Sequence, residues 1–375
     1  MYPNEPVITV VAPLIDAQLI ETTILLEINH QSLIATKTNR IVQAANGKPV
    51  SDFGARRAHN VDAAVYGARA AYIGGAAGTA TVLAGKMFHI PISGTMAHSW
   101  VMTFDSEYDA FKAYAESYPD GTVLLVDTYD VLKSGVPNAI RTAREVLEPM
   151  GKKLIGIRLD SGDLAYLSKE ARKMLDEAGL PDCMIVASNS LDEYTISSLN
   201  RQGAKIDSYG VGERLITSSS TPVFGAVYKL VAIQKDGKFI PKIKISETAE
   251  KITNPGIKEV YRVYDENGKA VADYLAVKGE QIRDFEPVRY VDPVNYWKNR
   301  SFVGCRFKKL QVPVFEKGKR IYDLPDIEEI RQYVKDQLEN EIWEEEQRFE
   351  NAHTHYLDMS PAMFELKMSL LHEEN

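Results

Sequence analysis

The chain has 375 residues, 45% of them hydrophobic and 26% charged, and its formal net charge is −8. This composition is that of an ordinary globular protein with one large and one smaller domain. The net charge argues against nucleic acid as the main partner, and neither a membrane-spanning run nor a signal peptide is recognisable. Cys183 and Cys305 are too few for a disulfide framework, so we expect a cytoplasmic protein.

The first part of the chain predicts a strand over residues 7–12 and a long helix over residues 14–45. From residue 51 onward, short apolar runs alternate with helical patterns. Asn60 is expected to cap an Ala-rich helix, and Asp105-Ser106 to cap another after a turn-rich segment that contains His98. The chain therefore enters a regular β/α alternation early.

This alternation is strictest between residues 123 and 212. Helical patterns separate four predicted strands, at residues 123–126, 153–159, 183–187 and 206–209. Strands that alternate with helices form parallel β/α units, and polar residues follow nearly every one of these strands. We therefore favour an irregular TIM-like β/α barrel, with an open doubly wound sheet as the alternative.

The last part of the chain has a different pattern. Strands with turn signals between them are predicted at residues 224–233, 239–245, 260–264 and 271–277, and a helix follows Asp326. We expect three parts: an α/β barrel with the active site over residues 14–222, a smaller mainly-β (α/β sandwich) domain from residues 1–13 and 223–310, and a C-terminal helical segment over residues 311–375.

The residues at the predicted strand ends form a chemical set. Three guanidinium groups suit phosphate or carboxylate; they belong to Arg56, Arg57 and Arg158. Four carboxylates are candidates for holding Mg²⁺ through substrate oxygens; they belong to Asp127, Asp130, Asp160 and Asp163. Gly210 and Gly212 allow backbone N–H groups to approach a phosphate. The set suggests a phosphorylated sugar substrate.

Each of these residues also has a purely structural interpretation. One Arg–Asp pair at a strand end is more often a structural ion pair, Phe53 fits a core position, and His98 fits a hydrogen-bonded core histidine. The glycines at 210 and 212 lack the third glycine of a dinucleotide fingerprint, and His353 with His355 lacks a third metal ligand. Because charged residues recur at successive strand ends, we favour a functional role for them over a purely structural one.

Several phrases of the sequence, in this order, resemble the nicotinate phosphoribosyltransferase family. They cover the chain from about Pro3 to about Leu371 and include Asp52-Phe53-Gly54-Ala55-Arg56-Arg57, Ser93-Gly94-Thr95-Met96-Ala97-His98-Ser99, Asp127-Thr128-Tyr129-Asp130 and Ile157-Arg158-Leu159-Asp160-Ser161-Gly162-Asp163. The resemblance implies that nicotinate attacks phosphoribosyl pyrophosphate to give nicotinate mononucleotide and pyrophosphate. It also implies Mg²⁺ as cofactor and ATP as a co-substrate whose hydrolysis is coupled to turnover.

The resemblance further implies a role for each matching residue. His98 is the histidine that ATP phosphorylates, and it acts with Arg158, Asp160 and Asp127, of which Asp127 and Asp160 lie around the ribose and metal. Phe53 stacks on the pyridine ring. The remaining substrate-binding residues are Arg56, Arg57, Thr95, Ser188, Asn189, Gly210, Gly212, Glu213 and Lys244. The resemblance also implies a homodimer with shared active sites, in which Lys244 reaches a phosphate in the neighbouring subunit.

Two further expectations follow from the resemblance. Nicotinamide-using relatives carry an aspartate where this chain has Ala80, so its absence favours the acid over the amide. Family members also have an N-terminal section before the equivalent of Pro3, which supplies strands and a tyrosine to the shared site. A truncated, non-catalytic fragment that binds phosphoribosyl ligands or a partner chain is therefore the alternative, and a nicotinamide or quinolinate phosphoribosyltransferase is the alternative within the class.

Overall fold

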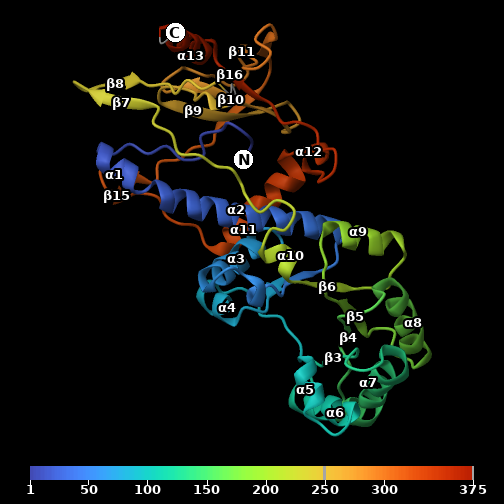
Figure 1. Ribbon diagram of the computed structural model, residues 1–375. Coiled ribbons are helices and arrows are strands. Elements are labelled where there is room, and N and C mark those ends of the chain that lie inside the picture. The colour runs from blue at the N-terminus through green and yellow to red at the C-terminus, as the bar shows by residue number, and fades with distance from the viewer. Residues whose placement is uncertain (248–250, 374–375) are drawn as a thin grey trace. The chain divides into compact units, whose positions relative to one another are not determined.

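The computed structural model describes residues 1–247 and 251–373, and it falls into two compact units (Figure 1). The barrel unit is Glu27–Gly225, and the β unit combines Met1–Leu26 with Ala226–Asn375. These limits place the start of the predicted long helix in the β unit. The three-domain division expected from the sequence stays a prediction.

A six-stranded parallel sheet forms the centre of the barrel unit. Its strands are β1 (Val50–Asp52), β2 (Gly78–Thr79), β3 (Val123–Leu125), β4 (Gly156–Leu159), β5 (Met184–Ala187) and β6 (Ser208–Val211). Their order is β2-β1-β6-β5-β4-β3, so the first strand pairs with the last, as in a barrel. The two edge strands of this sheet are β2 and β3. Among the described residues they are not paired with each other, so the barrel is open between them. The irregular TIM-like barrel is thus confirmed.

Helices follow the strands of this sheet. They are the 3₁₀ turn η1 (Ala55–Arg57), α3 (Val61–Ile73), α4 (Val82–Phe88), α5 (His98–Met102), α6 (Glu107–Ser117), the π-helical turn η2 (Val131–Gly135), α7 (Val136–Thr142), η3 (Ala143–Leu147), η4 (Glu148–Met150), α8 (Leu164–Glu177), α9 (Glu193–Arg201) and α10 (Glu213–Ile216). Asn60 caps α3, as predicted. Figure 1 shows α8 beside β4 and β5, on which its buried residues pack. The helix α8 therefore covers the two strands that it joins.

The long helix α2 (Glu21–Ala44) runs from the β unit into the barrel unit. Within the barrel unit, its buried Lys37 pairs with Glu193 of α9, with Nζ 2.6 Å from Oε2 and side chains only 3% and 1% exposed. Loss of one partner of such a buried ion pair is strongly destabilising, because the other charge then stays buried without compensation. It fixes α2 against α9 on the outside of the sheet.

The β unit contains a mixed six-stranded sheet of order β12-β11-β16-β10-β9-β13. Its strands are β9 (Lys258–Tyr264), β10 (Ala270–Val277), β11 (Val288–Val291), β12 (Asn299–Phe302), β13 (Arg306–Lys309) and β16 (Leu357–Met359). Arg262 of β9 makes two 2.9 Å hydrogen bonds to Asp273 of β10, and both side chains are buried. The helix α13 (Pro361–Glu373) packs against β10 and β11.

The remaining elements of the β unit are short. They are α1 (Leu14–Leu19), the hairpin β7 (Ala232–Lys235) and β8 (Lys238–Pro241), the hairpin β14 (Phe315–Glu316) and β15 (Lys319–Arg320), α11 (Ile327–Asp336), the π-helical turn η6 (Gln337–Glu341) and α12 (Glu344–Gln347). The predicted helix after Asp326 is confirmed, because Asp326 and Glu329 form a capping box at its start.

Three expectations for the β unit are wrong. Residues 7–12 form no strand, and Thr9 Oγ1 of this segment accepts a hydrogen bond from Gln311 Nε2 (3.1 Å). The strands expected at 224–233 and 239–245 are confined to β7 and β8. β-Branched residues favour strands only where a partner strand exists, and within residues 1–247 and 251–373 these segments pair as strands only in the β7–β8 hairpin.

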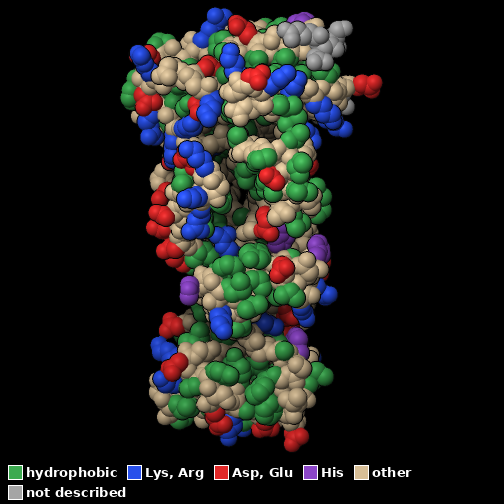
Figure 2. Space-filling model, turned by 90° about the vertical axis from the view of Figure 1, so that its left-hand side faces the viewer, with side chains coloured by type: hydrophobic (Ala, Val, Ile, Leu, Met, Phe, Trp, Pro, Cys, Tyr) green, Lys and Arg blue, Asp and Glu red, His purple; other side chains and the backbone are tan. Residues whose placement is uncertain are grey.

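No helix among the described residues is long and apolar enough to span a bilayer. Acidic and basic side chains are interspersed over the face of the molecule drawn in Figure 2, with apolar side chains scattered between them. The two cysteines, Cys183 and Cys305, are free and buried.

Candidate active site at the carboxyl ends of the barrel strands

Asp52 ends β1 and anchors the turn that follows it. Its side chain is buried, and its carboxylate accepts hydrogen bonds from Thr79 Oγ1 of β2 (2.7 Å) and from the Gly54 backbone N–H (2.8 Å). Burial raises the pKa of Asp52 above its usual range. These contacts join two neighbouring strand ends and fix the position of Phe53.

Phe53 and Arg158 form one side of the site. A Cβ added at Gly210 of β6 would lie 2.4 Å from the Phe53 ring, so glycine is needed for the ring to lie there. Arg158 lies over the same ring, 6.0 Å from its centroid, and its Nη1 donates to Thr95 Oγ1 (2.6 Å). Burial lowers the pKa of Arg158, and its buried Nε has no hydrogen-bond partner in the described chain. This guanidinium is arranged to receive an anion.

Two more arginines follow β1, and one of them, Arg56, interacts with the charge of Arg158. Arg56 and Arg57 are exposed on η1, directly after β1, and Arg57 Nε is 3.7 Å from Glu213 Oε2. The charge of Arg56 is one of the causes that lower the pKa of Arg158. The like charges favour binding of a substrate with several negative charges at this end of the barrel.

His98 and two aspartates form a second group of residues in the candidate site. His98 Nε2 is 3.6 Å from Asp160 Oδ2 and 3.9 Å from Asp127 Oδ1, while its Nδ1 is 3.1 Å from Thr128 Oγ1. Asp127 Oδ2 accepts from the Asp160 backbone N–H (2.9 Å) and from Ser161 Oγ (2.7 Å). Asp127 Oδ1 is buried and without a hydrogen bond within residues 1–247 and 251–373.

The end of β5 carries two of the expected substrate-binding residues, Ser188 and Asn189. The hydroxyl of Ser188 donates to Asp160, which links β5 to the aspartate pair. Asn189 and Ser190 both have positive φ, 83° and 49°. Such consecutive left-handed residues are costly and cluster at ligand-binding sites, where successive N–H groups form concave anion sites. The backbone geometry is thus consistent with the expected role of this turn.

Some expected residues lie elsewhere. Lys244 is exposed in the β unit, where its backbone N–H donates to Thr253 Oγ1 (3.0 Å). Asp130 caps η2 and Asp163 caps α8, each through Oδ1. Hydrogen bonds from the backbone are the main cause that lowers the pKa of Asp130. Both aspartates thus have a structural role, and their suggested part in holding Mg²⁺ stays a prediction.

Sequence reasoning missed three contributors to the site. Thr128, Ser161 and Asp52 make the contacts that hold His98, Asp127 and the turn at Phe53. Each stands beside a residue that was identified, so adjacency to a charged strand end was the available signal. Their partners come from other strands, which no local pattern reveals.

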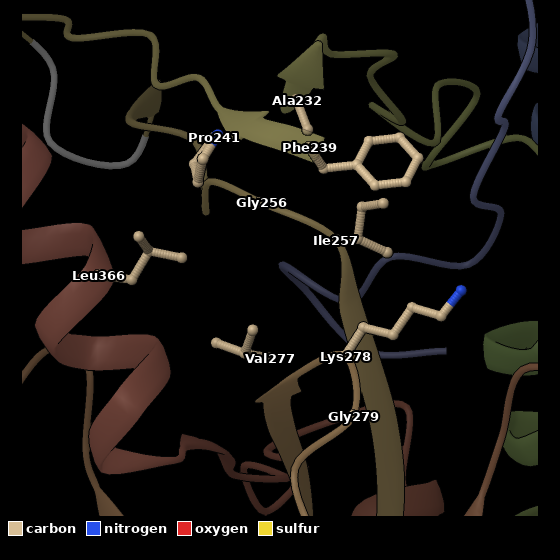
Figure 3. A pocket seen from close by; sticks show the side chains of 9 residues that line it. All are labelled: Ala232, Phe239, Pro241, Gly256, Ile257, Val277, Lys278, Gly279 and Leu366. Atoms are coloured by element: carbon tan, nitrogen blue, oxygen red, sulfur yellow. The ribbon is translucent and has the colours of Figure 1, made fainter. Parts of the chain in front are cut away.

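A pocket of about 450 Å³ lies in the β unit, apart from these residues. Figure 3 shows apolar side chains around it, from Phe239 of β8, Ile257, Val277 of β10 and Leu366 of α13, with the ammonium group of Lys278 pointing away from Leu366. Apart from Lys278, the described lining residues have no titratable side chain. The candidate active site is therefore sought at the strand ends of the barrel.

Residues 49–268 match the nicotinate phosphoribosyltransferase (NAPRTase) family, and residues 257–367 match the nicotinate phosphoribosyltransferase C-terminal domain. The chain belongs to the nicotinate phosphoribosyltransferase family. A nicotinate phosphoribosyltransferase of Bacillus subtilis (strain 168) is 50% identical over 374 residues, which are 100% of this chain and 76% of the relative. One from Dictyostelium discoideum is 36% identical over 97% of this chain and 70% of its own length.

A solved structure supports the same assignment. The crystal structure of human nicotinic acid phosphoribosyltransferase has a TM-score of 0.84 to this chain, with 26% identity, and the match covers 96% of this chain and 78% of the human one. The nicotinate phosphoribosyltransferase family is a family of enzymes, and the mixed α/β architecture with a parallel barrel sheet is shared with this neighbour.

Proposed function

We propose that this chain catalyses the transfer of a phosphoribosyl group to nicotinate. The pyridine nitrogen bonds to C1 of phosphoribosyl pyrophosphate as the C1–O bond to pyrophosphate breaks, which gives nicotinate mononucleotide, and ATP hydrolysis is coupled to the cycle. The proposal rests on one observation: the guanidinium of Arg158 and the ring of Phe53 lie at the same end of the barrel as His98 and its two neighbouring aspartates. This is the first step of NAD salvage from nicotinate.

Arg158 and Phe53 are the proposed base site. The planar ring offers a stacking surface, and the guanidinium, with its buried Nε unpartnered, offers donors to the nicotinate carboxylate. Ala80 follows β2, and its methyl side chain offers no acceptor for an amide. A carboxylate is therefore favoured over a carboxamide, because only the acid neutralises the buried cation.

Asp127 and Asp160 are the proposed residues around the ribose and Mg²⁺. Mg²⁺ is typically held by one or two carboxylates together with substrate phosphates, and the buried, unpartnered Oδ1 of Asp127 fits this requirement. Mg²⁺, when bound, neutralises charge on the departing pyrophosphate. Asp160, oriented by its backbone bond to Asp127 and by Ser188, faces the same space. Negative charge here also stabilises a ribosyl cation in the transition state.

His98 is the proposed phosphate acceptor from ATP. An imidazole nitrogen bonds to the terminal phosphorus of ATP while the bond to ADP breaks, and a neighbouring carboxylate accepts the imidazole proton. The 3.6 Å approach of His98 Nε2 to Asp160 supports this role. Water later cleaves the phosphorus–nitrogen bond and releases phosphate. The covalent step gives ATP a direct connection to the substrate site.

We further propose a cytoplasmic homodimer with shared active sites, in which Lys244 reaches a phosphate in the neighbouring subunit. Lys244 is exposed in the β unit, as such a contact requires. Two free, buried cysteines suit a reducing compartment.

Product formation tests the proposal directly. Nicotinate mononucleotide is measured chromatographically from nicotinate, phosphoribosyl pyrophosphate and Mg²⁺, with and without ATP, for the unsubstituted chain and His98→Ala, with nicotinamide as the control base. We expect ATP to raise product only when His98 is present, and nicotinamide to be a poor substrate. A folded chain that binds phosphoribosyl pyrophosphate but forms no product would contradict transferase activity and favour a non-catalytic binding role.

A further inference from the structure

The hydroxyl of Thr95 has a defined orientation. Thr95 lies between Ile92, which bridges to Thr79 of β2, and the start of α5. Its Oγ1 accepts from Arg158 Nη1 at 2.6 Å and is 3.4 Å from the Met96 carbonyl, to which it donates. A hydroxyl has a single proton, so donation to the carbonyl turns a lone pair towards the guanidinium. The segment thus fixes one edge of Arg158.

Thr95 is also the only described hydrogen-bond partner of the Arg158 side chain. No carboxylate within the described residues forms an ion pair with Arg158, and the ring of Phe53 supports only the face of the guanidinium. Stacking alone leaves the guanidinium free to rotate in its own plane. An in-plane hydrogen bond removes that freedom and leaves Nε for a ligand.

The same segment carries His98, three residues after Thr95. Its Nε2 faces Asp160, which follows β4, the strand that carries Arg158. The Thr95 hydroxyl therefore connects the strand of the base-binding cation to the segment of the phosphate acceptor. We propose that Thr95 is a positioning residue, which orients Arg158 for the carboxylate of the base and holds it in a fixed place relative to His98. This inference rests on the proposed function for the identity of the ligand, nicotinate.

Substitution by valine and by serine separates the hydroxyl from the shape of the side chain. Thr95→Val keeps the volume and removes the acceptor, whereas Thr95→Ser keeps the acceptor. We expect Thr95→Val to raise KM for nicotinate and to weaken nicotinate binding in calorimetry by about tenfold, as for loss of one hydrogen bond to a charged group. Thr95→Ser should stay within about twofold, and KM for phosphoribosyl pyrophosphate should change in neither variant.

A coupling readout belongs to the same experiment. If Thr95 also holds Arg158 relative to His98, Thr95→Val should hydrolyse more ATP for each nicotinate mononucleotide formed than Thr95→Ser does. Ser93→Ala is the matched control, because Ser93 is in the same segment but contacts Ser51 Oγ (3.3 Å) instead of Arg158. Thermal unfolding of all variants shows whether any effect is general destabilisation.

The outcomes separate this inference from the proposed function. Equal nicotinate affinity and KM in Thr95→Val and the unsubstituted chain would overturn the role of Thr95 and leave the transferase assignment intact. An unsubstituted chain that binds nicotinate but makes no product would overturn the transferase assignment, and the calorimetric comparison would still decide the role of Thr95. An equal rise in KM for both substrates, or a chain that does not bind nicotinate, would contradict the inference.

Discussion

The contact between Gly210 and Phe53 sets the shape of the base site at the scale of a single residue. A Cβ at position 210 would meet two ring carbons of Phe53 at 2.4 and 2.5 Å, closer than any real contact. We expect Gly210→Ala to displace the ring, to raise KM for nicotinate, and to destabilise the fold by about 1–3 kcal/mol, as for other overpacked sites. Steady-state kinetics and urea unfolding measure the two effects.

Gly121→Ala provides the control for this prediction. A Cβ at Gly121 meets nothing within 4 Å, and its φ is not in the left-handed region. We expect this variant to keep the activity and stability of the unsubstituted chain. Unchanged KM in Gly210→Ala would show that the Phe53 ring is not part of the nicotinate site.

The sequence was informative about which residues reach the site and poor on how they are held there. The charged residues at strand ends were predictable because a buried apolar run stops where a parallel strand delivers its last side chain. The contacts Arg158–Thr95 and Ser188–Asp160 were not, because they join residues from separate β/α units. The structural role of Asp130 and Asp163 was also not foreseen, since a carboxylate after a strand can equally be a helix cap.

At the scale of elements, the buried aspartate on β16 makes the β unit sensitive to pH. Asp358 is only 7% exposed, and burial, aided by the charge of Asp292, raises its pKa to about 7. The native state then binds more protons than the unfolded state between about pH 4 and pH 7. The stabilising contribution of Asp358 is therefore complete below pH 4 and is lost as pH rises through 7.

Asp358→Asn removes this titration and tests the effect. We expect the variant and the unsubstituted chain to have similar unfolding free energies near pH 4, and the variant to be more stable by upwards of about 1 kcal/mol at pH 8. Urea unfolding between pH 4 and 8 measures the difference, with the exposed Asp323→Asn as the control. A difference that does not vary with pH would mean that Asp358 is charged throughout this range.

Elements of the barrel unit were easier to predict than those of the β unit. The helix α8 was expected because its apolar residues recur at helical spacing and its first turn has a capping aspartate. Residues 7–12 have strand composition but find no partner, and the expected turn-rich segment contains the short helix α5. Helical periodicity is a local property, whereas strand formation depends on neighbours that are distant in the sequence.

At the scale of the whole molecule, the two units have separate cores. Buried clusters such as Val263, Tyr274 and Phe302 belong to the β unit, and Leu124, Ile157 and others belong to the barrel unit. The three tryptophans report on them separately, since Trp100 lies in the barrel unit and Trp297 and Trp343 in the β unit. Chains with two cores commonly depart from a single unfolding transition. Fluorescence thus distinguishes events in the two units.

This separation makes the location of the substrate site testable. Phosphoribosyl pyrophosphate with Mg²⁺, at one hundred times its Kd, should stabilise the unit that binds it by about 2.7 kcal/mol. We expect the transition followed through Trp100, in a Trp297→Phe/Trp343→Phe variant, to shift to higher urea. The transition followed through Trp297 and Trp343, in Trp100→Phe, should shift less, because the strand-end residues all belong to the barrel unit. A small shift through Trp297 and Trp343 agrees with a single contact from Lys244, whereas equal shifts through both probes would mean that the β unit contributes as much to binding as the strand-end residues do.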